Sequence, residues 1–288
     1  MNRFRTTRES VFTKFSACLL VLGGFVSSTG TYAVPADEID WEWKIKPTFP
    51  NEAYGPRTDV NPELTGDNHL FDVWAPEGEG QYPVVIYADG GGFSSGDKMK
   101  AIGSMPKLAG SKIVLKYRAP GNVHSPDKPW LPAAQDGQRA MSLVRSQSDE
   151  LGIDPDRIGI MGFSAGGAPV MYTALVSDRL YEQVDTHDNH NFRPAFAAPI
   201  YSGWWMPEGA NLSEATPPFF MVITYDDKDR SVGLAETFIA LKKAKVSAEM
   251  HIYSEGGHGY GLRRTDKPVT SWNDRMEDWL RLKGFLSK

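Results

Sequence analysis

Ser164 lies two residues from a glycine on either side in the stretch RIGIMGFSAGG, residues 157–167. A serine hydroxyl is a poor nucleophile near neutral pH, and it needs a base within hydrogen-bond reach that a third group orients. A G-x-S-x-G turn between a strand and a helix exposes such a serine and aims an amide, here that of Ala165, at the oxyanion of acyl transfer. Chance supplies the same pentapeptide in roughly one chain in ten of this length, so the surrounding elements decide its meaning.

Two stretches downstream supply the base and the acid that such a serine needs. His258 lies between glycines in EGGHGYG, after the last predicted strand, and is the candidate base. YDDKD offers Asp227, the second residue beyond a predicted strand, as the acid, while Asp226 and Asp229 are interpreted as turn carboxylates and remain alternatives to it. The order Ser164, Asp227, His258 is the order of an α/β-hydrolase triad along the chain.

A run of three glycines in DGGGF, residues 89–93, follows a predicted central strand. Glycines let the backbone approach a substrate closely with its amides exposed. The amides of Gly91 and Gly92 are therefore predicted to act with that of Ala165 as oxyanion donors, and losing one such donor typically costs about 3 kcal/mol of transition-state stabilisation. A plain glycine turn is the alternative for this loop taken alone.

Stretches of strand character alternate with helical stretches along the chain. Near-continuous apolar runs such as YPVVIYAD suit strands that are buried on both faces. The predicted strands are 69–77, 82–89, 111–118, 195–203, 217–225 and 246–255, and the predicted helices are 133–151, 165–176, 233–245 and a last amphipathic one through Trp272, Met276, Trp279 and Leu280. DPDR, residues 154–157, is predicted to be a turn before the strand that leads to Ser164. This alternation predicts an α/β fold of the α/β-hydrolase kind, with a mostly parallel central sheet flanked by helices on both faces and the chemistry-bearing loops at the carboxyl ends of its strands.

The first 33 residues have the pattern of a secretory signal peptide. Four basic residues precede the apolar run FSACLLVLGGFV, residues 15–26, and a small-residue cleavage site can be placed after Ala33 or Ala36. The run is short for a membrane span, and an uncleaved anchor is the alternative. Cleavage near Ala33 would leave a single catalytic domain at 34–288, with 34–67 as an N-terminal arm and first strand, and would export it to the periplasm or the medium.

Composition narrows the classes of partner. The formal net charge of −5 and the isoelectric point near 5.7 give no basic surface for nucleic acid, and after cleavage no apolar stretch is long enough for a membrane span. The single cysteine, Cys18, lies in the signal segment, so the mature chain is expected to have no disulfide, thiolate metal site or cysteine nucleophile. His187, Asp188 and His190 in THDNH lack a further ligand cluster and are expected to form a hydrogen-bonded loop, so no metal and no cofactor are predicted. The predicted partner is a small-molecule or carbohydrate ester, and the oligomeric state is left open.

Several of these stretches together resemble a known family. FDVWAPEG, YRAP, the block LPAAQDGQRAMSLVRSQSDELGIDPDRIGIMGFSAGG and AEMHIYSEGGHGYGLR are similar to those of α/β-hydrolase carboxylesterases of the feruloyl-esterase-like (BD-FAE) and acetyl-xylan-esterase-like group. The resemblance implies a serine esterase that removes acetyl or hydroxycinnamoyl groups from plant polysaccharides or oligosaccharides such as xylan. It also implies the roles assigned above to the triad and to the oxyanion amides. Ala168 and Asp89 depart from residues that are common in the group, and Asp89 is expected to put a carboxylate near the oxyanion loop.

Trp204 and Trp205, in YSGWWMPEG, follow a predicted strand. They could form an aromatic platform over a sugar ring, or they could be lid or core residues. A glycosidase is not predicted, because nothing pairs two carboxylates around a sugar bond as the triad pairs serine and histidine. Two alternatives to the esterase stay open: a serine peptidase on the same fold, and a non-catalytic carbohydrate-binding relative.

Overall fold

The structure, a computed structural model, describes residues 49–53, 70–74, 80–94, 111–118, 125–203 and 206–286. The predicted signal segment 1–33, most of the arm 34–67 and the tryptophan pair, Trp204 and Trp205, lie outside the described residues. All of the described residues belong to one compact unit.

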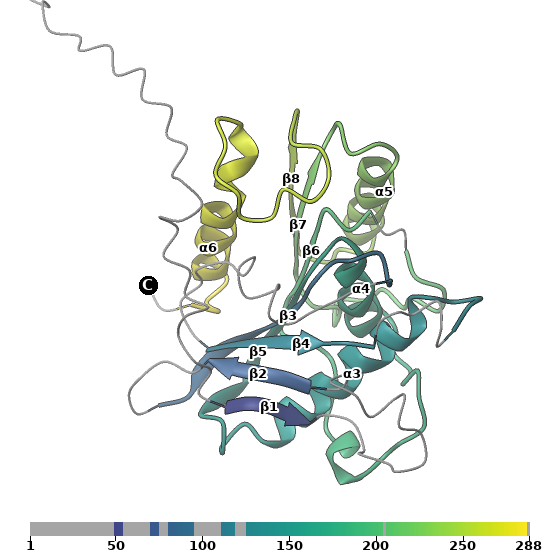
Figure 1. The fold of residues 1–288 in the computed structure, drawn as a ribbon, viewed down its shortest axis with the longest axis vertical. Coiled ribbons are helices and arrows are strands. Elements are labelled where there is room, and N and C mark those ends of the chain that lie inside the picture. The colour runs from purple at the N-terminus through teal and green to yellow at the C-terminus, as the bar shows by residue number, and fades with distance from the viewer. Residues whose placement is uncertain are drawn as a thin grey trace, which may run out of the picture. The chain divides into compact units, whose positions relative to one another are not determined.

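The strands of the described chain form one eight-stranded sheet (Figure 1). They are β1 (Phe49–Ala53), β2 (Leu70–Trp74), β3 (Tyr82–Ala88), β4 (Ser111–Lys116), β5 (Ile153–Phe163), β6 (Ala197–Ile200), β7 (Phe219–Thr224) and β8 (Ala248–Tyr253). Their order across the sheet is β1-β2-β4-β3-β5-β6-β7-β8. Strand β2 runs antiparallel to both of its neighbours, and every neighbouring pair from β4 to β8 is parallel. The prediction of a mostly parallel α/β sheet is confirmed.

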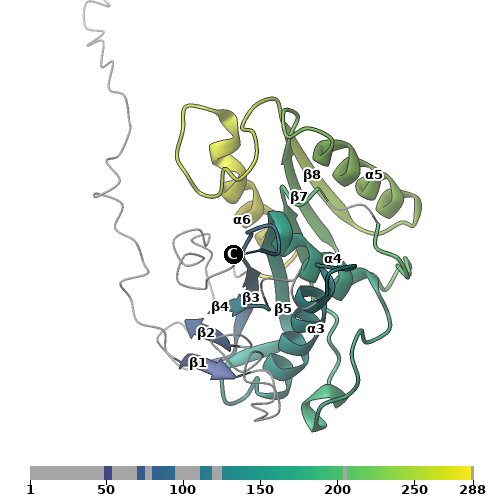
Figure 2. The same ribbon diagram turned by 45° about the vertical axis from the view of Figure 1, so that its right-hand side comes forward.

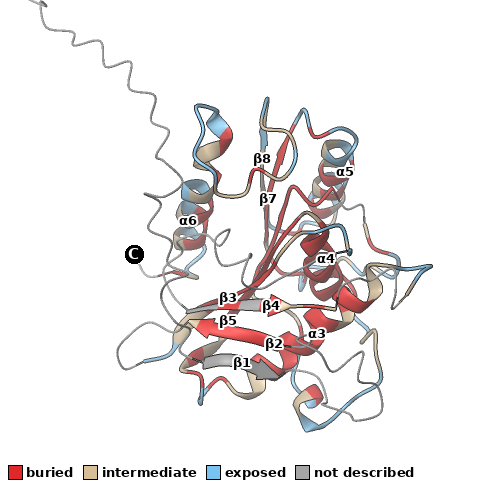
Figure 3. Ribbon diagram, in the orientation of Figure 1, coloured by how far each residue is buried: buried red, intermediate tan, exposed pale blue. Residues whose placement is uncertain are grey.

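The central strands form because their residues are apolar on both faces. Every residue of β7, FFMVIT, is buried, and so are the last five residues of β3. Such a strand is stable in the middle of a sheet that is covered on both sides. Figure 3 shows this arrangement, with buried strands at the centre and exposed residues on outer helix surfaces and loops.

Helices cover both faces of the sheet. In the described chain they are α3 (Leu131–Ser146), α4 (Gly167–Leu175), α5 (Arg230–Lys243) and α6 (Trp272–Leu282). Figures 1 and 2 show α6 on one side of the sheet and α4 and α5 on the other. Two adjacent residues of β5 point to these two layers: Phe163 meets Trp272 of α6 at 5.7 Å between ring centroids, whereas a Cβ on Gly162 would meet Val170 of α4. None of the helices described is both long enough and apolar enough to span a bilayer.

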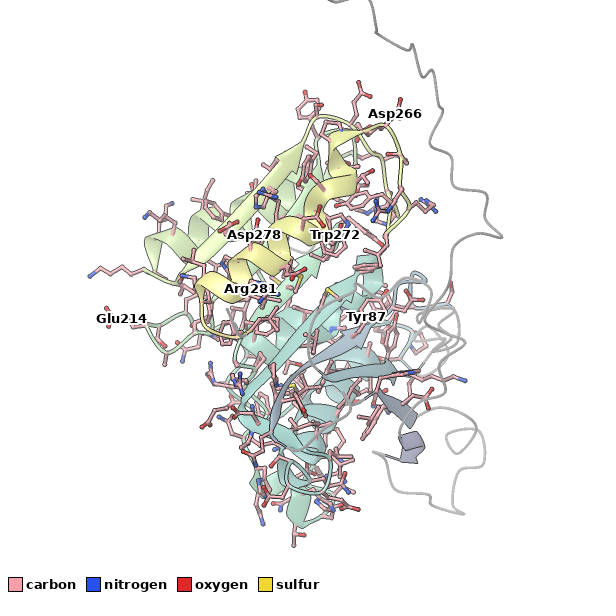
Figure 4. All side chains as sticks on the ribbon, turned by 90° about the vertical axis from the view of Figure 1, so that its left-hand side faces the viewer. Tyr87, Glu214, Asp266, Trp272, Asp278 and Arg281 are labelled. Carbon is pink, nitrogen blue, oxygen red and sulfur yellow. The ribbon has the colours of Figure 1, made fainter. Side chains whose placement is uncertain are left out.

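Helix α6 is amphipathic, as its sequence predicts. Its buried residues recur at helical spacing, and they are Trp272, Met276, Trp279 and Leu280. The ring of Trp279 packs against Phe196 and Phe220 of the sheet layer, at 5.9 and 5.6 Å between centroids. Figure 4 shows Trp272 near the start of the helix, with Asp278 and Arg281 further along it. Helix α6 therefore closes one face of the sheet with aromatic side chains.

Two local boundaries differ from the predictions. Residues 154–157, predicted to be a turn, lie inside β5, where the register with β3 shifts and the extra residues form a bulge. The Asp154 carboxylate accepts a hydrogen bond from the amide of Asp156 at 3.0 Å, so the local turn chemistry is present within a strand. The helix predicted over 133–151 ends at Ser146, because residues 147–152 form turns that lead into β5.

Candidate active site

Four parallel strands bring the predicted reactive residues to one edge of the sheet. Ser164 follows β5, Asp227 follows β7 and His258 lies in the loop after β8. The glycine loop, residues 89–93, follows β3. The carboxyl ends of parallel strands lie at the same edge, which is where open α/β sheets bind ligands. The topology thus gathers residues that are far apart in the sequence.

The backbone at Ser164 is strained in the way that a nucleophile elbow requires. Its φ of 51° lies in the left-handed region, which residues with a side chain seldom adopt. The chain leaves β5, passes through a single 3-10 turn, η2 (Ser164–Gly166), and enters α4. A Cβ on Gly162 would lie 1.9 Å from the carbonyl oxygen of Gly166, and one on Gly166 would lie 2.2 Å from that of Ala88. Only glycine fits at either position, and the turn places the amide of Ala165 at the start of the helical segment.

Two hydrogen bonds join the serine, the histidine and an aspartate. Ser164 Oγ lies 2.7 Å from Nε2 of His258, and Nδ1 of the same imidazole lies 2.8 Å from Oδ2 of Asp227. The Asp227 side chain is only 1% exposed, and its Oδ1 accepts a hydrogen bond from Arg230 Nη1 at 3.2 Å. A carboxylate on Nδ1 favours the tautomer in which Nε2 can take the serine proton. The geometry is that of a serine with a base and an orienting acid.

The other two acidic residues of YDDKD have different partners. The Asp226 carboxylate accepts hydrogen bonds from the amides of Gly256 and Gly257, at 3.1 and 2.8 Å. The bond from Gly257 is the main cause that lowers the pKa of Asp226 from its ordinary value. Asp229 is exposed and immediately precedes α5, where a carboxylate interacts favourably with the helix dipole. Of the three candidates, Asp227 is the one that the structure brings to the imidazole of His258.

The loop that carries His258 is held on both sides of that residue. Before it, Thr224 Oγ1 at the end of β7 donates a hydrogen bond to the carbonyl oxygen of Gly257 at 2.8 Å. After it, the indole Nε1 of Trp272 donates to the carbonyl oxygen of Gly261 at 2.8 Å. The imidazole is therefore presented from a loop whose backbone is fixed by two different elements.

A cluster of aromatic rings lies behind the triad. Phe163 contacts Tyr87 and Tyr201, each at 5.0 Å between centroids, as well as Trp272 at 5.7 Å. Tyr201 in turn packs edge-on against the imidazole of His258 at 5.3 Å. Figure 4 labels Tyr87 and Trp272, which come from the sheet and from α6. Sequence reasoning missed this cluster, because each ring taken alone is typical of an ordinary core residue.

The glycine loop lies directly against the elbow. A Cβ on Gly90 would be 3.3 Å from Cβ of Ser164 and 3.2 Å from the carbonyl oxygen that precedes it. Gly91 and Gly92 have φ values of 125° and 63°, which glycine adopts freely. Both are exposed, as oxyanion donors must be before substrate binds. Gly90, a residue that was not predicted to belong to the site, is therefore packed too closely against the elbow to carry a side chain freely.

Two tyrosine hydroxyls hold the first residue of the glycine loop. Tyr87 donates a hydrogen bond to Oδ1 of Asp89 at 3.0 Å, and Tyr117 donates to the carbonyl oxygen of Asp89 at 2.8 Å. Burial is the main cause that raises the pKa of both tyrosines, so both hydroxyls remain protonated donors at ordinary pH. The expected carboxylate beside the loop is thus present, and one of its oxygens serves to anchor the loop.

The stretch THDNH forms a hydrogen-bonded loop against α3. His187 Nδ1 lies 2.7 Å from Ser146 Oγ. The buried carboxylate of Asp188 pairs with Arg139 and Arg179, each at 3.0 Å. Within the described ranges, no group of three or more His, Cys, Asp or Glu side chains could hold a metal ion.

One family model matches the part of the chain that contains the glycine loop and the elbow. The BD-FAE family model matches residues 71–198, a segment that runs from β2 through the glycine loop and the elbow into β6. This segment of the chain is similar to the BD-FAE family. Asp227 and His258 follow the matched segment in the sequence.

Curated relatives of this chain include ester hydrolases. An acetylxylan esterase from Xylanibacter ruminicola is 22% identical over 223 residues, which cover 69% of this chain and 45% of that protein. Carboxylesterase NlhH from Mycobacterium tuberculosis is 31% identical over 121 residues, which cover 39% of this chain and 36% of that protein. The chain spans less than half the length of each of these two curated relatives.

A solved structure resembles most of this chain. It is that of an acetyl ester-xyloside bifunctional hydrolase from Caldicellulosiruptor lactoaceticus, with a TM-score of 0.65 and 25% sequence identity. The likeness covers 84% of this chain and 99% of that chain. The fold is that of an α/β-hydrolase.

Proposed function

We propose that this protein is a serine carboxylesterase that works through an acyl-enzyme. The observation that carries the proposal is the chain of hydrogen bonds from Ser164 Oγ to His258 at 2.7 Å and from His258 to Asp227 at 2.8 Å. A serine needs such a base and orienting group to react near neutral pH. The relatives named above, an acetylxylan esterase and a carboxylesterase, support ester chemistry.

In the first half-reaction, Ser164 Oγ attacks the carbonyl carbon of the ester while His258 Nε2 takes the hydroxyl proton. The carbonyl electron pair moves onto oxygen, and the amides of Ala165 and of Gly91 or Gly92 stabilise the oxyanion. The electron pair then returns and breaks the bond to the alcohol. The imidazolium gives its proton to the departing alcohol oxygen, which leaves an acyl group on the serine.

In the second half-reaction, water attacks the acyl carbon and His258 takes a proton from it. The second tetrahedral oxyanion uses the same amides as the first. Its collapse releases the carboxylic acid, and the proton on the imidazole returns to Ser164 Oγ. Throughout, the carboxylate of Asp227 orients the imidazole and stabilises its cationic form. This chemistry needs no cofactor.

The proposed substrates are acetyl or hydroxycinnamoyl esters on plant polysaccharides or oligosaccharides such as xylan. The acetylxylan esterase and the acetyl ester-xyloside hydrolase named above support this substrate class. Trp204 and Trp205 are proposed as a platform for a sugar ring, because they follow Gly203 in the sequence, a few residues after the end of β6, the strand beside the elbow strand. Residues 1–33 are proposed to be a signal peptide that exports the domain 34–288, since an enzyme for a plant polymer must meet it outside the cell.

Ser164→Ala in the mature protein tests the proposed reaction. The variant is expected to lose hydrolysis of p-nitrophenyl acetate to near background while keeping the melting temperature of the wild type. A serine-reactive phosphonate should label Ser164 in the wild type and should not label the variant. Equal rates of ester hydrolysis by the two proteins would contradict the proposal.

A substrate panel tests the acyl group and the alcohol. The panel measures acetate release from acetylated xylan and ferulate release from feruloylated arabinoxylan. The same assays include simple esters, aminoacyl and dipeptide substrates, and a xyloside. Turnover of the peptide substrates alone would instead indicate a peptidase. Xylan binding without turnover and without labelling of Ser164 would indicate a non-catalytic carbohydrate-binding protein.

A further inference from the structure

Asp226 makes contacts that the proposed triad does not use. The residue is exposed, yet its Oδ2 accepts a hydrogen bond from the amide of Gly256 at 3.1 Å and its Oδ1 accepts one from the amide of Gly257 at 2.8 Å. Two successive amides that point at one anion form a concave nest, a backbone arrangement that binds anions. The carboxylate therefore fixes the orientation of two consecutive peptide groups.

Both polar groups of Gly257, the residue before His258, are held from the end of β7. Asp226 accepts from its N–H, and Thr224 Oγ1 donates to its carbonyl oxygen at 2.8 Å. The loop also lies very close to β7 here, since a Cβ on Gly256 would be 2.6 Å from Cγ2 of Thr224. The two peptide groups on either side of the Gly257 Cα, the second of which leads into His258, are therefore each held by one hydrogen bond.

The sequence of this loop explains why external anchors are needed. EGGHGYG contains four glycines, and those at 257, 259 and 261 have φ values of 63°, 73° and 55°. Glycine is the residue that restricts the backbone least, so such a loop has little stiffness of its own. Asp227 fixes the imidazole through Nδ1, but the position of the ring also depends on where the backbone of His258 lies.

We propose that Asp226 is a positioning residue, which anchors the backbone in front of His258 and thereby sets where the imidazole Nε2 lies relative to Ser164 Oγ. The inference rests on the proposed function, in which this histidine is the base. Asp226 touches neither the nucleophile nor the imidazole in the contacts described above, so it acts through the loop. The hydrogen bond from the Gly257 amide is the largest cause that lowers the pKa of Asp226, because it stabilises the ionised carboxylate.

Kinetics of two Asp226 variants and a matched control test the proposal. Asp226→Ala is expected to lower kcat on p-nitrophenyl acetate about 10- to 100-fold with KM nearly unchanged, since small misplacements of a catalytic group have effects of this size. Asp226→Asn keeps an acceptor oxygen for one of the amides and should lie between Asp226→Ala and the wild type. Asp229→Ala removes an exposed carboxylate from the same loop and should keep the wild-type kcat.

A spectroscopic measurement tests the same proposal without substrate. The Nδ1–H proton of His258, which the structure pairs with Asp227, is expected to give a low-field NMR signal that Asp229→Ala retains and that Asp226→Ala broadens or shifts. If the wild type hydrolyses no ester, the proposed function fails, and the NMR comparison still decides the role of Asp226.

Three results would overturn the role of Asp226. They are an unchanged kcat in Asp226→Ala, a loss of kcat with an unchanged Nδ1–H signal, and an equal loss in Asp229→Ala. Melting temperatures are measured for every variant. If Asp226→Ala is unfolded at the assay temperature, the kcat and the signal of Asp226→Asn decide by the same criteria.

Discussion

Gly90 leaves no room for a side chain beside Ser164. The position that a Cβ of Gly90 would take lies 3.3 Å from Cβ of Ser164, which is tighter than almost all real contacts of that kind. The glycine loop and the elbow, which are separated by more than seventy residues in the sequence, therefore lie close together in the fold. A side chain at position 90 would push the oxyanion amides away from the serine.

Gly90→Ala is expected to lower kcat about tenfold with little change in the melting temperature, because a displacement of a few tenths of an ångström misplaces the oxyanion donors without breaking the core. Gly162→Ala provides the contrast. Its Cβ would lie 1.9 Å from a backbone oxygen of the elbow. This variant should therefore have a lower melting temperature as well as a lower kcat. Measuring kcat and the melting temperature for both variants distinguishes misplaced oxyanion donors from loss of the fold. Full activity of Gly90→Ala would show that the loop accommodates a side chain at this position.

Asp227→Asn is expected to lower kcat by about 10³- to 10⁴-fold, because the asparagine side chain does not hold the imidazole in the tautomer whose Nε2 accepts the serine proton. The change preserves the size of a side chain that is 1% exposed, so the fold should survive. Asp229→Asn is the control on the same loop and should retain activity. Circular dichroism and kcat are measured for both. A wild-type rate in Asp227→Asn would remove this residue from the proposed mechanism.

Arg230→Met is expected to have a small effect. The guanidinium donates to Asp227 at 3.2 Å, but it is 44% exposed, and ion pairs screened by water contribute about 0.2–1 kcal/mol. That corresponds to at most about a fivefold change in kcat. Methionine keeps the apolar stem on which Gly203 packs. Steady-state kcat is measured at low and at high salt. A loss of kcat much larger than fivefold at both salt concentrations would mean that the arginine does more than support the carboxylate.

The fold and the triad could be predicted because their signals are local. Alternation of buried strands and amphipathic helices specifies a parallel sheet, and the order of its loops along the chain specifies which of them meet at the carboxyl edge. Steric limits at Gly162 and Gly166 make the elbow recognisable from five residues. The three residues proposed as the triad, Ser164, Asp227 and His258, are those that the structure brings together.

The rest of the site depends on how distant segments meet, and local patterns do not contain that information. Gly90 is recognisable as a site residue only once the elbow is placed beside it. Asp226 has the sequence context of an ordinary turn carboxylate, and its bonds to the histidine loop follow from the pairing of β7 with β8. The bulge at 154–157 has the same origin, since Asp and Pro favour a turn while the neighbouring strand favours continued pairing.

Trp272→Phe is expected to lower the free energy of unfolding by about 1–3 kcal/mol, because the carbonyl oxygen of Gly261 loses the indole donor. The variant should also lower kcat, since this bond fixes the loop after His258. Trp279→Phe removes a similar volume from the same helix, away from the histidine loop, and serves as the control. Urea unfolding and kcat are measured for both. Equal kcat values in the two variants would show that the indole bond has no effect on the site.

Asp188 forms the centre of an ionic cluster with Arg139 of α3 and with Arg179. The Asp188 side chain has no exposed surface and accepts from Arg139 and Arg179, each at 3.0 Å. Burial alone would raise the pKa of this carboxyl, but hydrogen bonds from the amide of Val184, the hydroxyl of Tyr181 and the guanidinium of Arg139 lower it below its ordinary value. The pKa of Asp185, which also pairs with Arg139, is lowered as well, chiefly by that bond.

Asp188→Asn is expected to reduce the free energy of unfolding near pH 7 by about 3–5 kcal/mol, because the buried guanidinium of Arg139 and the partly buried one of Arg179 lose their shared carboxylate. A carboxyl with a lowered pKa in the folded state contributes stability that is complete above the unfolded pKa, about 3.9, and is lost as the pH falls through the folded value. The difference between wild type and variant should therefore be constant down to about pH 5 and shrink below pH 4. Urea unfolding at pH 7, 5 and 3.5 measures it, with Asp266→Asn, at an exposed loop position, as the control (Figure 4). A difference that stays constant to the lowest pH would mean that the cluster stabilises the fold by packing and not by charge.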